Sequence, residues 1–301
     1  MPRIAVTGAS GLIGSALVEH LRARGDSVVA FVRGTPTGPD QRPWQPRPGG
    51  LAAAYLDDVD AVVHLAGAGV GDRRWTPASK ETILRSRVEG TTAVAEAVAA
   101  HAEAGHQVRL VSGSAVGYYG DRGDELLDER SAPGDGFLAE VVRAWEGAAA
   151  PAVESGAPVA FARTGLVMAR DGGAFSRIMA LARLGLAGPL GSGQQWWPWI
   201  TLADEVRALA LLVDRRDLTG PVNLVAPQPA QQREVAAAIA TQLSRPALLP
   251  APSLALRLAV GEFADDILAS QRVVPAALRA AGFDSVHPTL ESAATWLTAR
   301  D

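Results

Sequence analysis

The chain has 301 residues, which exceeds the common single-domain size of about 100 to 200, so we expect one large domain with a lobe, or two domains. Its formal net charge of −4 argues against a nucleic-acid binder, because such proteins more often carry a basic surface. Cysteine is absent, which excludes disulfides, thiolate metal sites and a cysteine nucleophile.

The sequence also offers no pattern for a metal or a membrane. Its five histidines are scattered without metal-ligand spacing, so we expect no metal site. Neither a signal-peptide pattern nor an apolar run of about 20 residues, the length of a membrane span, is present. We therefore expect a soluble cytoplasmic protein with no nucleic-acid or membrane partner.

The first 34 residues predict a nucleotide-binding unit. Residues 4–7 form an apolar β-branched strand, an amphipathic helix follows, and residues 27–32 supply a second strand. Between strand and helix, Gly8, Gly11 and Gly14 are spaced GxxGxxG. The first glycine suits a tight turn, the second allows a pyrophosphate to approach, and the third lets the helix pack on the strand. The helix N-terminus then faces the phosphates, although a turn without a ligand remains the alternative.

The end of the second strand favours NADP(H) over NAD(H). NAD-preferring sites usually place an acidic residue there to bond the ribose 2′-hydroxyl, whereas an arginine suits a 2′-phosphate. This strand ends with Arg33, and residues 27–39 contain neither Asp nor Glu. The alternative is that Arg33 is only a solvated residue at the strand end.

Further strands and helices alternate along the chain. Residues 35–50 are rich in Pro and Gly, and we expect a surface excursion without regular structure there. Residues 60–67 form a buried strand that carries His64, which we interpret as a packed core histidine. The other expected elements are helices at 77–100 and 136–150 and strands at 107–112, 158–163 and 222–225. This alternation predicts an α/β, doubly wound parallel sheet of the Rossmann type.

The pattern changes after residue 163. A glycine-rich stretch at 185–193 leads into residues 194–200, which hold three tryptophans. Flat amphipathic rings are typical of a cleft wall or an interface, and core packing of one or two of them is an equal alternative. Thr201 is a candidate N-cap for a following helix, and Asp204 and Glu205 are expected to cap that helix as well.

Several motifs together resemble the extended short-chain dehydrogenase/reductases, in the NAD-dependent epimerase/dehydratase group. The chain is most similar to an atypical branch called epimerase family proteins, whose C-terminal domain has no known function. The resemblance covers nearly the whole length. It is carried by TGASGLIG (7–14), HLAG (64–67), SRVEGT (86–91), SAVGYYG (114–120), RTGLV (163–167), GPLGSGQQWWPWI (188–200) and residues 256–283.

This resemblance implies a domain division, a cofactor and a set of contacts. It implies a Rossmann domain at 1–165, to which 201–226 returns, and a smaller C-terminal α/β lobe at 166–200 and 227–301. The cofactor is NADP(H), with the substrate in a cleft between the two parts. The implied cofactor contacts are Gly8, Ser10, Gly11, Leu12, Ile13, Gly14, Val32, Arg33, Leu65, Ala66, Gly67, Arg87 and Val167.

The usual catalytic pair of the superfamily is absent. Typical members use a serine with Tyr-x-x-x-Lys, in which the lysine lowers the pKa of the tyrosine. Here residues 137–142 occupy the place of that motif and contain neither residue, and the one lysine of the chain, Lys80, lies upstream. The candidates for catalysis are Ser114, Tyr118 and Tyr119.

Three hypotheses remain open. In the first, the protein is an NADP-dependent oxidoreductase or epimerase-like enzyme acting on an unknown small hydroxy or carbonyl compound, with Arg163 or another cation in place of the lysine. In the second, it binds NADP(H) without turnover, as a redox sensor or an interaction protein. In the third, Ser114 and the tyrosines are structural and the chemistry lies elsewhere in the cleft. A protein partner or a homodimer is compatible with each hypothesis.

Overall fold

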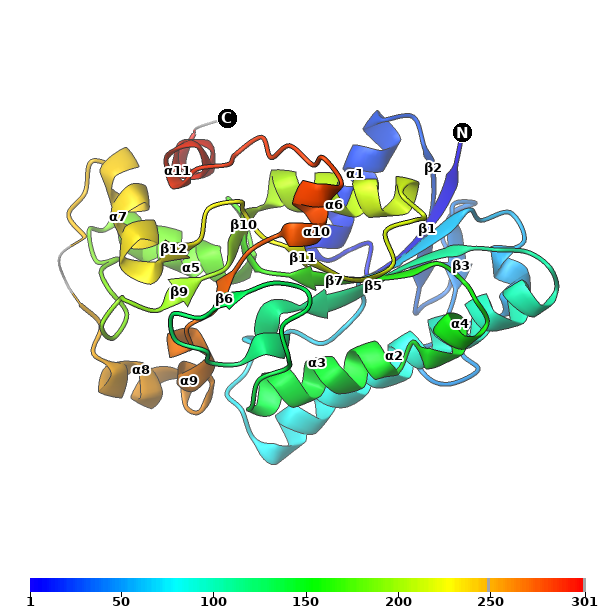
Figure 1. Cartoon of the computed structure of the whole chain (residues 1–301), viewed down its shortest axis with the longest axis horizontal. Coiled ribbons are helices and arrows are strands. Elements are labelled where there is room, and N and C mark those ends of the chain that lie inside the picture. Colours follow the sequence, from blue (N-terminus) through cyan, green and yellow to red (C-terminus); the bar gives the residue numbers. More distant parts are fainter. Residues whose placement is uncertain (248–249, 300–301) are drawn as a thin grey trace.

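The computed structural model describes residues 1–247 and 250–299, and its centre is one parallel sheet (Figure 1). Seven strands are hydrogen-bonded in the order β11-β7-β5-β4-β1-β2-β3. This order confirms the predicted doubly wound α/β sheet, because the chain starts in the middle and winds outward in both directions. The strands are β1 (Arg3–Thr7), β2 (Ser27–Val32), β3 (Gln41–Pro43), β4 (Ala61–His64), β5 (Arg109–Ala115), β7 (Val159–Thr164) and β11 (Gly220–Leu224).

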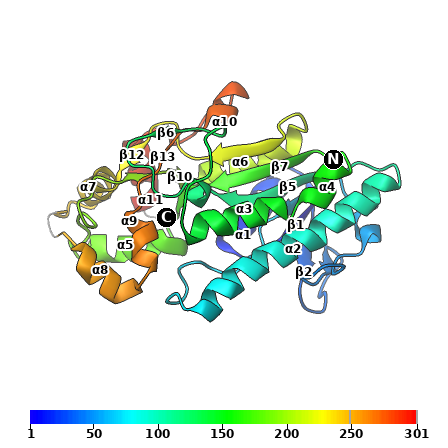
Figure 2. The same cartoon turned by 60° about the horizontal axis from the view of Figure 1, so that its bottom comes forward.

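Helices cover both faces of the sheet (Figures 1 and 2). One face carries α1 (Leu12–Ala23) and α6 (Leu202–Asp214), which pack on each other. The other face carries α2 (Pro77–Glu103), α3 (Phe137–Gly147) and α4 (Ala150–Glu154). Right-handed crossovers bring the carboxyl ends of all strands to one edge. Among the described residues, no helix is both long and apolar enough to cross a bilayer.

The surface excursion at 35–50 contains one short strand, so the expectation of no regular structure there was wrong. Strand β3 runs alongside β2, and Trp44, the residue that follows it, donates its backbone N–H to Val32 at 2.9 Å. An edge strand tolerates proline because one of its sides needs no ladder hydrogen bonds. The Trp44 side chain is buried and anchors the excursion to the core below it.

The C-terminal part forms a lobe of short elements beside the sheet. Two two-stranded ladders, β8 with β10 and β9 with β12, lie in it, and a further one joins β13 of the lobe to β6 of the preceding part of the chain. The strands are β6 (Leu126–Leu127), β8 (Leu166–Met168), β9 (Trp196–Trp197), β10 (Trp199–Thr201), β12 (Ala230–Gln231) and β13 (Arg272–Val273). The helices are α5 (Gly173–Arg183), α7 (Gln232–Gln242), α8 (Ser253–Val260), α9 (Phe263–Leu268), α10 (Ala276–Ala280) and α11 (Leu290–Thr298). Two short 3₁₀ turns, η1 (Ala53–Leu56) and η2 (Val116–Tyr119), lie earlier in the chain.

The tryptophan run builds the core of this lobe. Trp197 and Trp199 are buried in one cluster with Phe175. Trp196 is half-buried, and its indole N–H donates to Asp124 at 2.6 Å. Core packing, the alternative that the sequence left open for one or two rings, therefore holds for two of the three.

The lobe is attached to α2 through a contact around Lys80. The Lys80 ammonium bonds to Glu262, which directly precedes α9, and lies 4.9 Å from the ring centre of Phe137 at the start of α3. Beside it, the rings of Trp75 and Phe263 lie 5.1 Å apart. A cation over aromatic rings, with a carboxylate partner, joins α9 to the first turns of α2 and α3.

The first turn of α6 contains the expected cap and one buried acid. Thr201 accepts a hydrogen bond from the Asp204 backbone N–H at 3.1 Å, which confirms it as the N-cap. The Glu205 carboxyl instead turns into the protein, where it is 0% exposed and accepts from the Thr164 hydroxyl at 2.7 Å. Burial raises the pKa of Glu205 to about 8, with the Thr164 bond opposing this shift. Glu205 is therefore mostly a neutral acid at pH 7.

We predict that Glu205→Gln flattens the pH dependence of stability above pH 5. Because the folded pKa is raised above the ordinary 4.5, the native state holds a proton that the unfolded chain loses, and stability falls as pH rises towards 8. The slope from one proton is about 1.4 kcal/mol per pH unit. Urea unfolding at several pH values measures this slope. Glu19→Gln, at an exposed position of α1, is the control and should leave it unchanged; a slope that persists in Glu205→Gln contradicts the assignment.

Candidate functional site

The glycine turn is packed so closely that two of its positions exclude any side chain. Gly8 has φ +69°, and a Cβ there would lie 2.9 Å from the backbone nitrogen of Ala66. A Cβ at Gly14 would lie 2.1 Å from the Gly8 carbonyl oxygen. Gly11 has more room, since its nearest contact would be 3.3 Å away, and it is exposed. The turn therefore fixes β1, α1 and the end of β4 against one another and leaves Gly11 open to solvent.

One threonine organises the end of β4 beside this turn. The Thr7 hydroxyl accepts from the backbone N–H groups of Leu65 at 3.1 Å and Ala66 at 3.2 Å, and lies 2.8 Å from His64 Nδ1. His64 is fully buried, and burial lowers its pKa to about 4, so it is neutral at pH 7. His64 is thus the packed core histidine that the sequence indicated.

The N-terminus of α1 opens towards the same edge of the sheet. Its N-cap is Gly11, which offers no side chain to the first N–H groups of the helix, and Ser10 before it is exposed. The side chain of Leu12 instead meets the lobe, because Cβ atoms built on Gly172 and Gly173 would lie 3.3 and 3.0 Å from its methyl groups. Ile13 and Val167 are half-buried against the core under the sheet. These helix N–H groups can bind an anion.

Two arginines near the turn have no carboxylate partner among the described residues. Arg33 is exposed where β2 ends, directly after the half-buried Val32. Arg87 is enclosed: its Nη1 donates to the Ala68 carbonyl at 2.9 Å, its guanidinium lies 4.9 Å from the centre of the Trp145 ring, and a Cβ on Gly67 would be 3.6 Å from it. Burial lowers the pKa of Arg87 to about 10, so it remains charged at pH 7. A buried cation without an acid is costly unless an anion joins it.

Ser114 takes part in a buried charge network. Its hydroxyl donates to Glu146 Oε1 at 2.6 Å and is 4% exposed. Arg163 donates to both oxygens of the same carboxylate, from Nε at 2.8 Å and from Nη2 at 2.9 Å. This two-bond geometry gives a strong and directional ion pair. The Ser114 hydroxyl is therefore already committed to a protein group.

The two tyrosines lie in different surroundings. Tyr119 is 0% exposed, donates to Asn223 Oδ1 at 2.7 Å and accepts from Arg163 Nη1 at 3.1 Å. Burial raises the pKa of Tyr119 to about 12, against the opposing influence of Arg163. Tyr118 is half-buried, its ring centre lies 3.5 Å from the Arg163 guanidinium carbon, and its hydroxyl has no protein partner in the described structure. Of the pair, only Tyr118 keeps its hydroxyl available.

Three residues around these groups had not been predicted from the sequence: Glu146 and Asn223 in the charge network, and Trp145 beside Arg87. Glu146 and Trp145 lie on α3, and Asn223 lies on β11. Glu146 did leave a signal, because Ala139 and Val142 precede it at helical spacing and an acid on a buried helix face needs a partner. No sequence pattern of this kind marks Asn223. Its bond to Tyr119 depends on the pairing of β11 with β7.

Two family models match the chain. The model described as the NAD dependent epimerase/dehydratase family matches residues 4–225. A domain of unknown function, DUF1731, matches residues 251–297. An epimerase family protein of Mycobacterium tuberculosis (strain CDC 1551 / Oshkosh) is 43% identical over 298 residues, which cover 99% of this chain and 98% of the relative.

Solved structures agree with the family models. The crystal structure of the human epimerase family protein SDR39U1 (isoform 2) with NADPH matches at a TM-score of 0.87 and 31% identity, covering 98% of both chains. A nucleoside-diphosphate sugar epimerase from Corynebacterium glutamicum matches at a TM-score of 0.79 and 36% identity, covering 97% of this chain and 57% of that one. The likeness extends over the main sheet and the lobe together.

We predict that Glu146→Gln destabilises the fold by about 3 to 5 kcal/mol, because it leaves the Arg163 guanidinium buried beside a neutral amide. Urea unfolding at pH 7 measures the loss. Glu140→Gln, one exposed position on the same helix, is the matched control and should change stability by less than about 0.5 kcal/mol. Equal losses in the two variants would show that the ion pair contributes nothing.

Proposed function

The chain belongs to the NAD dependent epimerase/dehydratase family, and on this premise we propose that it binds NADP(H) at the glycine turn. The observation that carries the proposal is the arrangement of Arg33 and Arg87, two cations without a carboxylate partner among the described residues, on either side of a helix N-terminus that no side chain caps. A dinucleotide phosphate brings anionic groups to which such donors are complementary.

The residues of the turn fit a dinucleotide. The exposed Gly11 lets the pyrophosphate approach the N–H groups of Leu12 and Ile13. Ser10 and the backbone of Leu65, Ala66 and Gly67 border the same edge, and Val167 stands at the lobe side. We assign Arg87 to a phosphate or ribose oxygen of the nucleotide. Because its guanidinium is buried, its attraction to an anion is stronger than it would be in water.

Arg33 gives the preference for the 2′-phosphate. It follows Val32 at the end of β2, where a cation favours NADP(H) and an acid would favour NAD(H). The human relative was crystallised with NADPH, which supports the same choice.

We further propose an oxidoreductase or epimerase-like reaction on a small hydroxy or carbonyl compound. When bound, the nicotinamide supplies or accepts hydride. The chain must then move one proton, and Tyr118 is the residue we assign to this step, since its hydroxyl is not engaged by the protein. Ser114 and Tyr119 position it indirectly, through Glu146 and Arg163. The substrate would lie between the Rossmann part (1–165 and 201–226) and the lobe (166–200 and 227–301).

A second function is favoured by one observation. The hydroxyls of Ser114 and Tyr119 are both buried and bonded to protein groups, so two of the three catalytic candidates are unavailable. This supports a protein that holds NADP(H) without turnover and responds to its redox state, through a protein partner or a second copy of the chain. Deuteride transfer, described below, separates the two functions.

We predict that Arg33→Ala weakens NADPH binding by about tenfold or more and leaves NADH binding within about twofold, because only NADPH carries the 2′-phosphate. Fluorescence titration of each nucleotide measures the two affinities. Arg22→Ala, at an exposed position of α1 far along the helix from the turn, is the control. Parallel losses for NADPH and NADH would rule out the 2′-phosphate contact.

The reaction is tested with NADPH deuterated at C4, incubated with a cell metabolite extract and followed by mass spectrometry. Deuterium that enters a metabolite only with the protein present establishes turnover and names the substrate class. We predict that Tyr118→Phe then lowers kcat by about 100-fold or more, as the loss of a general acid does, while nucleotide affinity is unchanged. Bound NADPH without any label transfer would instead support the sensor function.

A further inference from the structure

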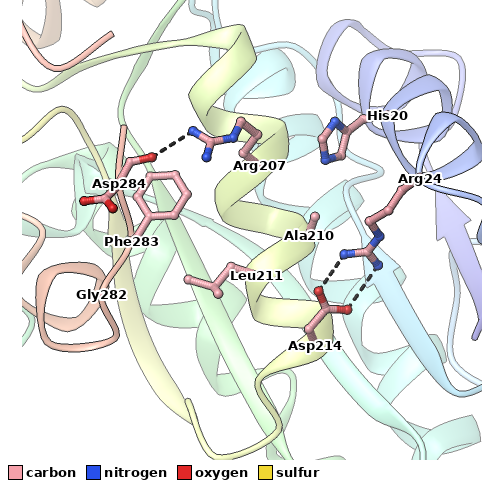
Figure 3. A pocket seen from close by; sticks show the side chains of 9 residues that line it. All are labelled: His20, Arg24, Arg207, Ala210, Leu211, Asp214, Gly282, Phe283 and Asp284. Atoms are coloured by element: carbon pink, nitrogen blue, oxygen red, sulfur yellow. Dashed lines mark hydrogen bonds and ion pairs between the residues drawn. The ribbon is translucent and has the colours of Figure 1, made fainter. Parts of the chain in front are cut away.

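A cavity lies away from the glycine turn, between α1, α6 and the segment that follows α10 (Figure 3). It measures about 320 Å³. His20 and Arg24 line it from α1, Arg207 and Asp214 from α6, and Phe283 from the third segment. His20 lies eight residues after Leu12, which is about 12 Å along the helix from the turn. The cavity is therefore separate from the proposed cofactor site.

Arg24 is already neutralised within this cavity. Its Nη1 and Nη2 donate to the two oxygens of Asp214 at 2.5 and 3.0 Å, and its Nε donates to Asp26 at 2.6 Å. Two carboxylates thus surround one guanidinium and use three of its nitrogens. Arg24 therefore lines the cavity with its guanidinium nitrogens already bonded to carboxylates, and we do not assign it to a further anion.

Arg207 and His20 have donors to spare, and Figure 3 shows their side chains on neighbouring helices at the same end of the cavity. Nη1 of Arg207 donates to the Asp284 carbonyl at 2.8 Å and to Asp204 Oδ1 at 3.3 Å. The Asp204 carboxylate also accepts from the backbone N–H groups of Val286 and His287 at 2.7 and 2.9 Å, so these donors and Arg207 bind the same carboxylate. A guanidinium has five N–H groups, and Nε and Nη2 of Arg207 find no acceptor in the described structure.

His20 lies beside two guanidinium groups, those of Arg24 and Arg207. The His20 ring has no hydrogen-bond partner among the described residues. Burial lowers its pKa, the charges of Arg24 and Arg207 lower it further, and Asp26 opposes them. The acidic groups around the cavity are Asp26 and Asp214, which are paired with Arg24, Asp204, which bonds to Arg207, and Asp284, which is exposed. An anion between His20 and Arg207 would accept hydrogen bonds from both side chains and would oppose the influence of the two guanidinium charges on His20.

We propose that this cavity binds a small oxyanion, a phosphate or carboxylate group held between Arg207 and His20. The floor beneath these two residues is apolar, formed by Ala210, Leu211 and the Phe283 ring, whose centre lies 5.4 Å from the Arg207 guanidinium carbon. A ligand that carries a short hydrocarbon part beside its anionic group fits this lining. Arg207 also donates to the Asp284 carbonyl, so an anion bound to Arg207 and His20 would link the segment after α10 to both α1 and α6.

The test is a titration of the whole chain with inorganic phosphate and, separately, with acetate, at constant ionic strength set by chloride. Histidine side-chain NMR reports the pKa of His20, whose signal is assigned from the His20→Asn spectrum. We expect phosphate or acetate to raise the pKa of His20 by about one unit. A larger effect of phosphate identifies a phosphate ligand, and a larger effect of acetate identifies a carboxylate ligand; both support the site.

Arg207→Gln is the decisive variant, since it keeps a polar side chain on α6 but removes the charge and the guanidinium donors. We expect the anion affinity to fall by about tenfold or more. Arg22→Gln, at an exposed arginine of α1, the helix that carries His20, is the control and should bind as the unmodified chain does. Far-UV circular dichroism verifies that each variant is folded. An unchanged His20 pKa at tens of millimolar anion, or equal affinity in Arg207→Gln, overturns the proposal.

Discussion

The buried ion pair between Arg163 and Glu146 holds the carboxyl edge of the sheet together. It joins β7 to α3, and through its remaining atoms it reaches Ser114 on β5 and, by way of Tyr119, Asn223 on β11. Each of these groups is satisfied by another, so no member can be removed without leaving a polar atom unpaired in a low dielectric. The half-buried ring of Tyr118 lies against the same guanidinium, 3.5 Å from its carbon.

This network bears on the missing lysine. In the usual arrangement the lysine is a point charge beside a tyrosine on the same helix, whereas here the nearest fixed cation is a planar guanidinium that a carboxylate already neutralises. Residues 137–142 of α3, which occupy the place of the usual pair, are apolar apart from Glu140, and Leu138 packs against η2 at 3.3 Å from a Cβ on Gly117. The ring of Tyr118 thus lies against a guanidinium that is already paired with a carboxylate, and no lysine ammonium stands beside it.

The fold was largely predictable because its signals are local. Strand β1, the glycine turn and the N-cap at Thr201 each follow from the residue types within a few positions. The site was predictable only where a motif fixes backbone, as at Gly8 and Gly14. Ser114, Tyr118 and Tyr119 looked alike in sequence, yet their burial depends on α3 and β11, which lie far away in the chain. Strand β3 was missed for a similar reason, since its pairing with β2 outweighs a sequence rich in proline.

The single lysine gives this protein an unusual chemical handle. Lys80 is the one side-chain amine in the sequence, and it stands where α2 and α3 meet the Glu262 side of the lobe. An amine-reactive dye would therefore attach, apart from the chain's α-amino group, at this junction alone. Acylation also removes the charge that bonds to Glu262, so the same reagent both labels this contact between the sheet's helices and the lobe and weakens it.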